Sequence, residues 1–278
     1  MKNHQHQLSQ KLSEELAAAA LTCRKYIVDM LTPAKSSHLG CSFSIIDILV
    51  VLYHRILDIE KIKTQDRTRD YFLLSKGHGA AALYAVLASV DLIASEELKK
   101  YHHPDSALAG HPTRDLTKGI EASTGSLGHG LSMGVGLALA AQHDQRPSKV
   151  YVLVGDGESQ EGSIWEAVAM ATRFALDNLI IIVDYNNLQG LDRTDDIMPN
   201  LAEKFVAFGC HVTTIDGHCH QTLLSTFKTL ANTGKPSVII AKTIKGKGIA
   251  FIQDKLEWHY RSFNPEQHDI ALKELENS

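Results

Sequence analysis

Two short apolar runs separated by one amphipathic segment constrain the fold of this chain more than any other feature. Residues 149–154 and 179–183 are rich in β-branched side chains, which is typical of strands buried in a parallel sheet. Between them, residues 160–174 carry apolar side chains at helical spacing. The sequence therefore predicts a strand–helix–strand unit with both strands running in the same direction.

A polar loop follows each of these runs. Gly155-Asp156-Gly157 comes after the first run, and Asn186-Asn187 comes after the second. Ligands of open α/β sheets collect outside the carboxyl ends of the strands, so we expect the Asp156 carboxylate and the Asn186 amide oxygen to lie together. Mg²⁺ and Ca²⁺ prefer such oxygen ligands. Either loop alone is typical of an ordinary turn, but the pair predicts a metal-bridged diphosphate site.

The rest of the chain predicts strands and helices in alternation. Predicted strands are 70–75, 149–154, 179–184, 211–215 and 237–242, and predicted helices are 8–31 (ending at Pro33), 45–53 (capped by Ser44), 79–90, 127–142, 160–174, 200–208, 219–232 and 269–275. Residues 101–123 and 244–260 are predicted loops, and 244–278 form a C-terminal loop and tail. This order predicts one α/β domain over residues 1–278, a mainly parallel sheet with helices on both faces.

Composition excludes several classes of protein. The 278 residues are 44% hydrophobic, enough for one large core, and a net charge of −4 without basic clusters argues against nucleic acid as a partner. The sequence has no apolar run long enough for a membrane span and no secretory leader, so we expect a cytoplasmic protein and no membrane partner. His102-His103 and His218-Cys219-His220 suggest metal binding by composition only, and their spacing does not predict a zinc site.

Further loops carry glycine and histidine motifs in a fixed order. They are Ser37-His38-Leu39-Gly40, Ser75-Lys76-Gly77-His78-Gly79, Gly110-His111-Pro112, Ser123-Thr124-Gly125-Ser126-Leu127-Gly128-His129-Gly130, the Gly155 loop continuing to Gly162, Lys245-Gly246-Lys247-Gly248 and Trp258-His259. Together with the Asn186 segment, this set resembles the transketolase family of thiamine-diphosphate enzymes. The resemblance covers roughly residues 25–262, nearly the whole chain. It is to the diphosphate-binding half of the family fold.

The resemblance implies a set of site residues. The implied metal ligands are Asp156, Asn186 and the main-chain carbonyl of Leu188, with Mg²⁺ as the expected ion and Ca²⁺ or Mn²⁺ as alternatives. The implied contacts to thiamine diphosphate are His78, Gly125, Ser126, Leu127, Gly155, Asp156, Gly157, Glu161, Asn186 and Lys245. The implied catalytic residues are His38, His78, His111 and His259. Leu39, Ser126 and His129 depart from the residues most common in the family at these positions.

The implied reaction moves a two-carbon ketol unit from a ketose, or its phosphate, to an aldose acceptor, with thiamine diphosphate as cofactor. Imidazoles titrate near neutrality and can donate a proton to a developing alkoxide or accept one from a hydroxyl. Several converging histidines therefore suit a ketol transfer between sugars. Taken alone, each histidine also has a structural interpretation: His78 and His111 lie beside glycines, where a backbone turn is sufficient to explain them.

The resemblance also implies a missing half. Family transketolases are much longer and carry a second domain that binds the aminopyrimidine ring of the cofactor. We therefore expect this chain to be the N-terminal subunit of a split transketolase. It would be inactive alone and would assemble with a separately encoded, C-terminal pyrimidine-binding subunit as an α2β2 heterotetramer. Arg24, Arg114 and Arg261 are candidate contributors to a sugar-phosphate site held largely by that partner.

Other functions stay open at this point. One is a related thiamine-diphosphate ketol or acyl transferase acting on an unusual sugar, such as a dihydroxyacetone-forming, sulfosugar or branched-sugar enzyme. Another is a degenerate, non-catalytic binding subunit that keeps the fold. A simple nucleotide-binding domain is disfavoured, because the sequence lacks a GxxxxGK[ST] loop.

Overall fold

A parallel sheet forms the centre of the molecule. In the computed structural model, which describes residues 2–230 and 234–277 and the side chains from residue 10 onward, the strands are β1 (Tyr71–Leu74), β2 (Val150–Gly155), β3 (Leu179–Tyr185), β4 (His211–Asp216) and β5 (Ser237–Lys242). Their order is β1-β2-β3-β5-β4, and every neighbouring pair is parallel. The register pairs Gly155 with Asp184, so β2 and β3 end at the same level.

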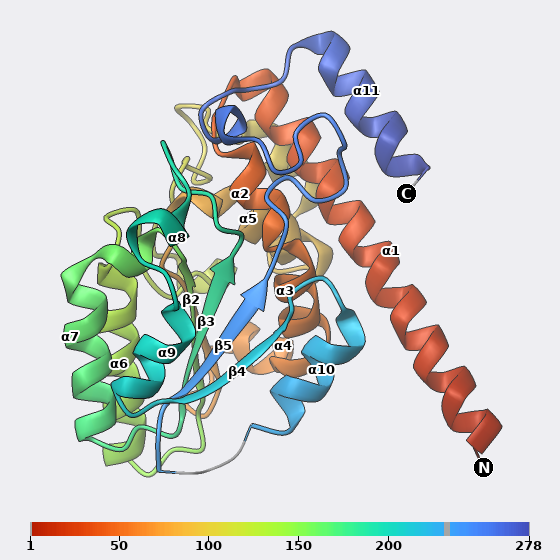
Figure 1. The fold of residues 1–278 in the computed structure, drawn as a ribbon. Coiled ribbons are helices and arrows are strands. Elements are labelled where there is room, and N and C mark those ends of the chain that lie inside the picture. The colour runs from red at the N-terminus through yellow and green to blue at the C-terminus, as the bar shows by residue number, and fades with distance from the viewer. Residues whose placement is uncertain (1, 231–233, 278) are drawn as a thin grey trace.

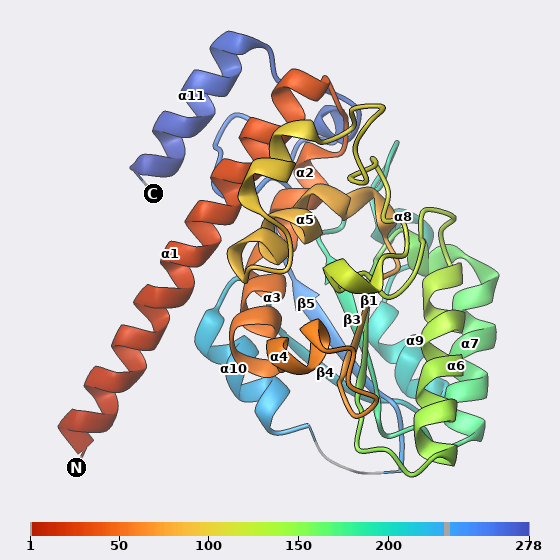
Figure 2. The ribbon, with the colours of Figure 1, turned by 180° about the vertical axis from the view of Figure 1, so that it is seen from behind.

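Helices cover both faces of the sheet (Figures 1 and 2). On one face lie α6 (His129–His143), α7 (Gly162–Arg173) and α9 (Leu201–Ala207), and on the other lie α1 (Lys2–Ala34), α3 (Ile46–Val51), α5 (Ala80–Ser89) and α10 (His220–Lys228). Alternate residues of each strand enter opposite cores. Val152 packs on the α6 side, whereas Leu153 packs on the other. Both faces are buried, which explains the continuous apolar runs in the sequence.

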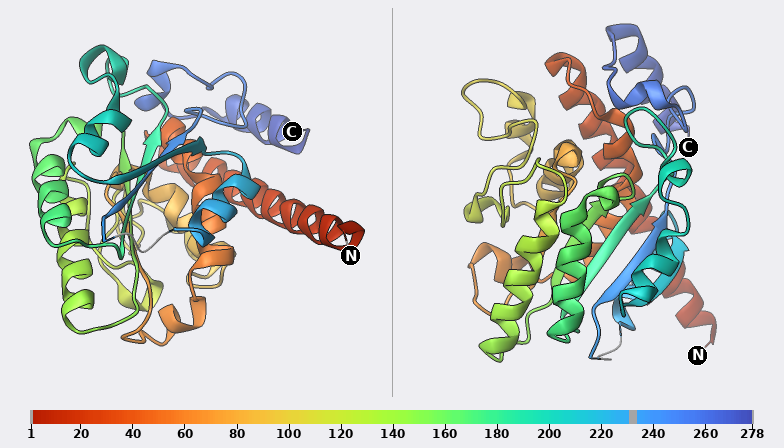
Figure 3. Two further views of the ribbon diagram at one scale, coloured as in Figure 1. Left: turned by 60° about the horizontal axis from the view of Figure 1, so that its bottom comes forward. Right: turned by 60° about the vertical axis from the view of Figure 1, so that its left-hand side comes forward.

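The last helix of the chain packs against the first. Helix α11 (Pro265–Glu276) lies along the C-terminal half of α1, while the N-terminal half of α1 extends beyond the rest of the fold (Figures 1 and 3). Asn264 caps α11 with a complete capping box, in which Gln267 is the reciprocal partner. Leu275 and Ala271 are fully buried in the core that includes α1.

Short elements connect the longer helices and the strands. They are α2 (Leu39–Ser44), the π-helical turn η1 (Leu52–Ile56), α4 (Ile59–Lys63), α8 (Thr194–Ile197) and the 3₁₀ turns η2 (Gly77–Gly79), η3 (Ser95–Lys100), η4 (Leu116–Lys118), η5 (Glu158–Gln160) and η6 (Leu256–His259). Turns η2 and η5 follow β1 and β2 directly. The motif loops therefore meet at one edge of the sheet, as expected for an α/β fold.

The sequence predicted the sheet and its helices but misplaced several boundaries. Ser44 does not cap a helix: it ends α2, and its hydroxyl donates to Asp184. Helix α1 includes Pro33 and ends one residue later, at Ala34. This difference is within the one or two residues by which helix ends vary. Helix α10 ends at Lys228, and residues 231–232 of its predicted span lie outside the described residues. Helix α11 begins at Pro265, four residues earlier than predicted.

No helix within the described residues is long and apolar enough to cross a membrane.

Two glycines of α6 make a matched test of this packing. A Cβ at Gly134 would lie 2.4 Å from Cγ2 of Val152 on β2, whereas one at Gly136 would meet nothing within 4 Å. We expect Gly134→Ala to lower the free energy of unfolding by about 1–3 kcal/mol through overpacking. Gly136→Ala should raise it by about 0.5–1 kcal/mol, because alanine favours the helix. Urea denaturation of both variants measures the difference, and equal effects would contradict this packing of α6 on β2.

Candidate active site

The motif loops enclose one cavity of about 480 Å³ at the carboxyl edge of the sheet. Of the residues predicted for the site, those that line it are His38, His78, His111, Gly125, Leu127, Gly155, Asp156, Gly157, Glu161, Asn186, Leu188, Lys245 and His259. Ser126 is the exception: it is exposed and does not line the cavity. The structure thus brings together nearly all the residues that the resemblance singled out.

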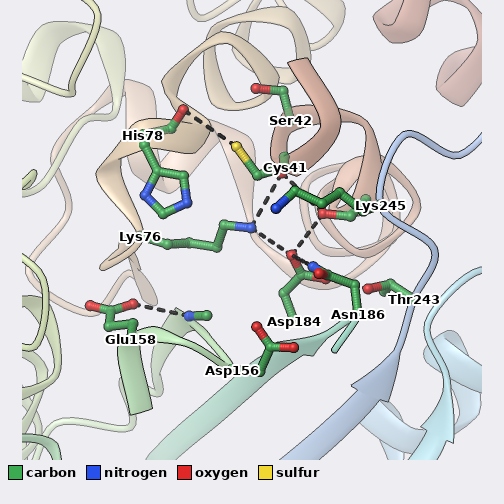
Figure 4. A network of polar contacts seen from close by, with 12 residues as sticks. Cys41, Ser42, Lys76, His78, Asp156, Glu158, Asp184, Asn186, Thr243 and Lys245 are labelled. Carbon is green, nitrogen blue, oxygen red and sulfur yellow. Dashed lines mark hydrogen bonds and ion pairs between the residues drawn. The ribbon is translucent and has the colours of Figure 1, made fainter. Parts of the chain in front are cut away.

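Asp156 and Asn186 lie side by side just beyond β2 and β3 (Figure 4). Asp156 is 5% exposed, and its Oδ2 accepts hydrogen bonds from the Asn187 N–H (2.6 Å) and the Thr194 hydroxyl (3.2 Å). Burial, and then the nearby Asp184 carboxylate, raise the pKa of Asp156 to about 6. A buried carboxylate with a raised pKa is one that a cation would stabilise in its charged form.

The Asn186 side chain has a fixed orientation. Its Nδ2 donates to Oδ2 of Asp184 at 3.1 Å, and its Oδ1 accepts from the Leu188 N–H at 3.1 Å. An ionised carboxylate can accept hydrogen bonds but cannot donate them. The end of the Asn186 amide that faces Asp184 must therefore be the NH₂ group, Nδ2. The oxygen is therefore directed away from Asp184 and into the loop that contains Leu188.

Asp184 is the most heavily hydrogen-bonded carboxylate of the site. It is completely buried, and besides Asn186 it accepts from the ammonium of Lys76 (2.5 Å), the hydroxyl of Ser44 (2.7 Å) and the hydroxyl of Thr243. Burial acts to raise the pKa of Asp184, but Lys76 and these donors outweigh it and hold the pKa below its usual value. Figure 4 shows three of these donors, Lys76, Asn186 and Thr243, near Asp184.

Lys245 brings a second buried ammonium to the cavity. Its Nζ donates to the carbonyl oxygens of Leu188 (3.0 Å) and Gln189 (3.2 Å) and to Nδ1 of His259 (2.9 Å). The Lys245 side chain runs over Gly40, where a Cβ would come within 2.8 Å of its Cγ. A side chain at position 40 would thus displace Lys245. Burial lowers the pKa of Lys245.

The four predicted histidines form a cluster in the same cavity as Asp156, Asn186 and Lys245. The ring centroid of His38 lies 5.3 Å from those of His78 and His259 and 6.1 Å from that of His111. His38 occupies the left-handed region (φ 70°) at the start of α2, and its N–H donates to the carbonyl of His259. Gly125, with φ 149°, lies against the ring of His111. Loops from four parts of the chain therefore present imidazoles to one space.

The inner imidazoles of this cluster are neutral at physiological pH. Burial, followed by the charges of His111 and Lys245, lowers the pKa of His38 to about 4. Burial and Lys245 lower the pKa of His259 to about 3, and burial holds the pKa of His78 well below its usual value. A neutral imidazole has one donor and one acceptor nitrogen, so each can pass or receive a proton.

Glu158 joins three of the motif loops beneath the cavity. Its Oε1 accepts from the Ser75 hydroxyl (2.5 Å) and the Gly128 N–H (2.9 Å), and its Oε2 accepts from the Gly155 N–H (3.0 Å). Burial raises the pKa of Glu158. The loops after β1, before α6 and after β2 are thus held in register by one side chain.

Comparison with known proteins is consistent with this geometry. Residues 16–274 match the family model described as the thiamine diphosphate binding domain of transketolase. The chain belongs to the transketolase family. It is 41% identical to one subunit of the apulose-4-phosphate transketolase of Actinobacillus succinogenes, over 95% of this chain and 97% of that protein. It is 40% identical to a 6-deoxy-6-sulfo-D-fructose transketolase subunit of a Clostridium species, over 94% and 96% of the two chains.

The solved structure of Campylobacter jejuni transketolase has the same fold as this chain. It superposes with a TM-score of 0.84 at 31% identity and covers 94% of this chain. The match extends over 42% of the Campylobacter protein, so the chain spans about two fifths of the length of that transketolase. The shared region is the diphosphate-binding part, in agreement with the fold predicted from sequence.

Other residues considered from the sequence lie outside the cavity. Arg114 and Arg261 are exposed and do not line it, and Arg24 binds Asp47 (2.6 Å) and the Lys247 carbonyl. His218 and His220 contact the same Asp47, at 2.7 and 2.8 Å. Among the described residues, no three histidine, cysteine or acidic side chains are arranged to hold a metal ion.

Sequence reasoning missed several residues of the site, among them Glu158, Lys76, Asp184 and Tyr260. Lys76 and Asp184 form its central ion pair, and Tyr260 lines its entrance. A signal for the ion pair was present: Asp184 is a charged residue at the end of an otherwise apolar strand, which is rare unless it is paired. Tyr260 follows Trp258-His259 directly, but nothing in its local pattern distinguishes it from an exposed tyrosine.

The low pKa of His38 predicts a pH-dependent stability. An unfolded histidine takes up a proton near pH ~6.5, whereas folded His38 does so only near pH 4, its lowered pKa. The unfolded chain therefore binds more protons between these values, and this residue makes the fold less stable as the pH falls from ~6.5 toward 4. His38→Asn keeps a residue that tolerates φ 70° but cannot titrate. We expect its Tm to fall less than that of the wild type between about pH 7 and about pH 5. An equally steep fall would contradict the assignment.

The buried ion pair of Lys76 and Asp184 predicts that removing one charge lowers the free energy of unfolding much more than removing both. Asp184→Asn leaves a buried ammonium without its counter-ion, and we expect a loss of about 3–5 kcal/mol in the free energy of unfolding. Lys76→Met combined with Asp184→Asn removes both charges and should recover most of that loss. Urea denaturation of the chain measures both, and a double variant as unstable as the single one would contradict the dominance of the ion pair.

Proposed function

We propose that this chain is the diphosphate-binding subunit of a two-subunit transketolase, with residues 1–278 forming one domain. The observation that carries the proposal is the cavity itself, where an oxygen-rich cation site, two buried ammonium groups and four imidazoles line one space. Such a site combines cofactor anchoring with proton transfer. Sugar or sugar-phosphate ketoses and aldoses are the proposed substrates.

The residues present fit thiamine diphosphate and a divalent cation. The Asp156 carboxylate, the Asn186 amide oxygen and the Leu188 carbonyl are hard oxygen donors, which suit Mg²⁺ and also Ca²⁺ or Mn²⁺. The Leu188 carbonyl already accepts from a cation, the Lys245 ammonium. The proposed cofactor contacts are His78, the 125–127 loop, Gly155, Gly157, Glu161 and Lys245; of that loop, Gly125 and Leu127 line the cavity.

The chemistry then divides between cofactor and protein. When bound, thiamine diphosphate would supply the carbon centre that carries the two-carbon unit. The neutral imidazoles of His38, His78 and His259 can donate a proton to a sugar oxygen or accept one from it. Lys245 donates to Nδ1 of His259, so the proton of the neutral His259 ring is on Nε2. His259 is thereby oriented as a donor.

A partner subunit completes the proposal. Two of the relatives that match over nearly their full length are named as single subunits of an apulose-4-phosphate transketolase, which implies a second subunit in those enzymes. We propose that the partner of this chain binds the pyrimidine end of the cofactor and that the assembly is an α2β2 heterotetramer in the cytoplasm. The relatives are named for different sugars, apulose 4-phosphate and 6-deoxy-6-sulfo-D-fructose, so their names do not fix the substrate here.

The main alternative is a non-catalytic binding subunit. The cluster of neutral histidines in the cavity favours catalysis, because anchoring the cofactor alone does not require several imidazoles. A second candidate function is a related ketol transferase that acts on an unusual sugar and differs from the proposed transketolase only in its substrate. The observation that favours it is the similarity to a relative named for a sulfosugar.

The test uses the chain together with a pyrimidine-domain subunit encoded in the same genome. Calorimetry measures thiamine diphosphate binding with and without Mg²⁺, and we expect binding to need the metal. Asp156→Asn should weaken it by about tenfold or more, because it removes a charged ligand. Asp105→Asn, at a side chain that is 89% exposed, is the matched control and should leave affinity unchanged.

Ketol transfer by the assembly is the second measurement. We expect turnover from the two chains together and none from this chain alone. Full turnover by the chain alone would contradict the split-subunit proposal. Metal-dependent cofactor binding without turnover would instead favour the non-catalytic alternative.

A further inference from the structure

Tyr260 stands at the entrance of the cavity. It follows η6 directly and lines the same space as His259, with a ring centroid 4.7 Å from that of His259 at an interplanar angle of 60°. The residue is exposed, with 60% of its surface accessible, whereas His259 is partly buried. The phenol of Tyr260 therefore lies next to the histidine cluster, on its solvent-exposed side.

The opposite wall of the entrance is the loop after β3. The Tyr260 hydroxyl packs against Gly190 so closely that a Cβ there would lie 2.4 Å from it. Gly190 comes two residues after Leu188, whose carbonyl belongs to the cation site. The phenol thus spans from η6 to the loop of the cation site and narrows the opening between them.

The hydroxyl of Tyr260 is available to a ligand. Within the described part of the chain, no hydrogen bond joins it to another residue, although it lines a polar cavity. Leu191, one residue beyond Gly190, is 87% exposed but does not line the cavity. The two neighbouring exposed side chains therefore differ: Tyr260 belongs to the cavity, and Leu191 belongs to the outer surface.

We propose that Tyr260 is a specificity-determining residue for the sugar. Its hydroxyl donates a hydrogen bond to an oxygen on the part of the sugar that extends outward from the histidines. Its ring restricts the width of the entrance. A phenol suits this role, because it presents an apolar face to C–H groups and a polar tip to hydroxyls. The identity of the ligand as a ketose or aldose rests on the proposed function.

Kinetics of the two-subunit assembly test the proposal, with D-xylulose 5-phosphate and D-fructose 6-phosphate as donor probes. Tyr260→Phe removes only the hydroxyl, and we expect KM for both probes to rise about two- to tenfold with kcat within about twofold of the wild type. Tyr260→Ala also widens the entrance. The ratio of the KM for fructose 6-phosphate to that for xylulose 5-phosphate should then fall by about threefold or more.

A second route to the same group uses Gly190. Gly190→Ala displaces the Tyr260 hydroxyl through the close contact, and we expect a rise in KM similar to that of Tyr260→Phe. In the Tyr260→Phe background the clashing oxygen is absent, so Gly190→Ala should add little. Additive effects of the two substitutions would contradict the link between them.

Leu191→Ala is the matched control, because it alters an exposed neighbour outside the cavity. Its KM should stay within about twofold of the wild type. Subunit association is measured for all variants. If Tyr260→Ala weakens association while KM at saturating partner is unchanged, Tyr260 is a partner contact and the proposal is overturned.

Calorimetry of probe binding separates this proposal from the proposed function. If the wild-type assembly binds a probe but does not turn it over, the proposed transketolase reaction is contradicted. The Kd of the Tyr260→Phe assembly for that probe still decides whether the hydroxyl binds the sugar. An unchanged Kd in that variant overturns the proposal. So does the failure of both probes to bind the wild-type assembly.

Discussion

The buried carboxylate of Asp184 is the interaction on which the site depends. It accepts from Ser44, Lys76, Asn186 and Thr243, which belong to α2, the turn after β1, the turn after β3 and the turn after β5. A fully buried carboxylate is costly unless it is paired and hydrogen-bonded, so these segments are stable only when they converge on it. The same contacts position the Asn186 amide, so the geometry of the proposed cation site follows from the packing of the sheet edge.

A second buried carboxylate, Asp47, holds the segment around Lys245 from outside the cavity. The Ile244 N–H donates to Nε2 of His218, so the ring proton is on Nδ1 and is donated to Asp47. Arg24 links the same carboxylate to the carbonyl of Lys247. Residues on both sides of Lys245 are therefore tied to Asp47, which lies outside the cavity. His218 thus has a structural explanation, although its motif suggested metal binding by composition.

The sequence predicted what depends on local pattern. The apolar runs became β2 and β3, and the register placed Gly155 opposite Asp184, so Asp156 and Asn186 came together as expected from their places after two strands. It could not predict which residues pair over long separations. Lys76 and Asp184 are 108 residues apart, and neither local pattern indicates the other. Serine is a residue type that often caps helices, but the Ser44 hydroxyl instead donates a tertiary hydrogen bond to Asp184. Tyr260 was missed for the same reason, because its place depends on Gly190 in a distant loop.

The charges of the two lysines support the proposed binding of a diphosphate in the cavity. Lys76 is neutralised by Asp184 at 2.5 Å. Among the described residues, Lys245 contacts carbonyl oxygens and His259 and has no carboxylate in direct contact. Burial lowers its pKa, although the charges of Asp156 and Asp184 nearby act to raise it. The Lys245 charge lowers the pKa of the nearby imidazoles in addition to their burial, and it favours an anion in the same space. An anion that binds here offsets the cost of burying Lys245, and it does so next to neutral histidines that can exchange protons with a sugar. The proposed anchoring and the proposed proton transfer thus share one ammonium that, among the described residues, has no carboxylate in direct contact.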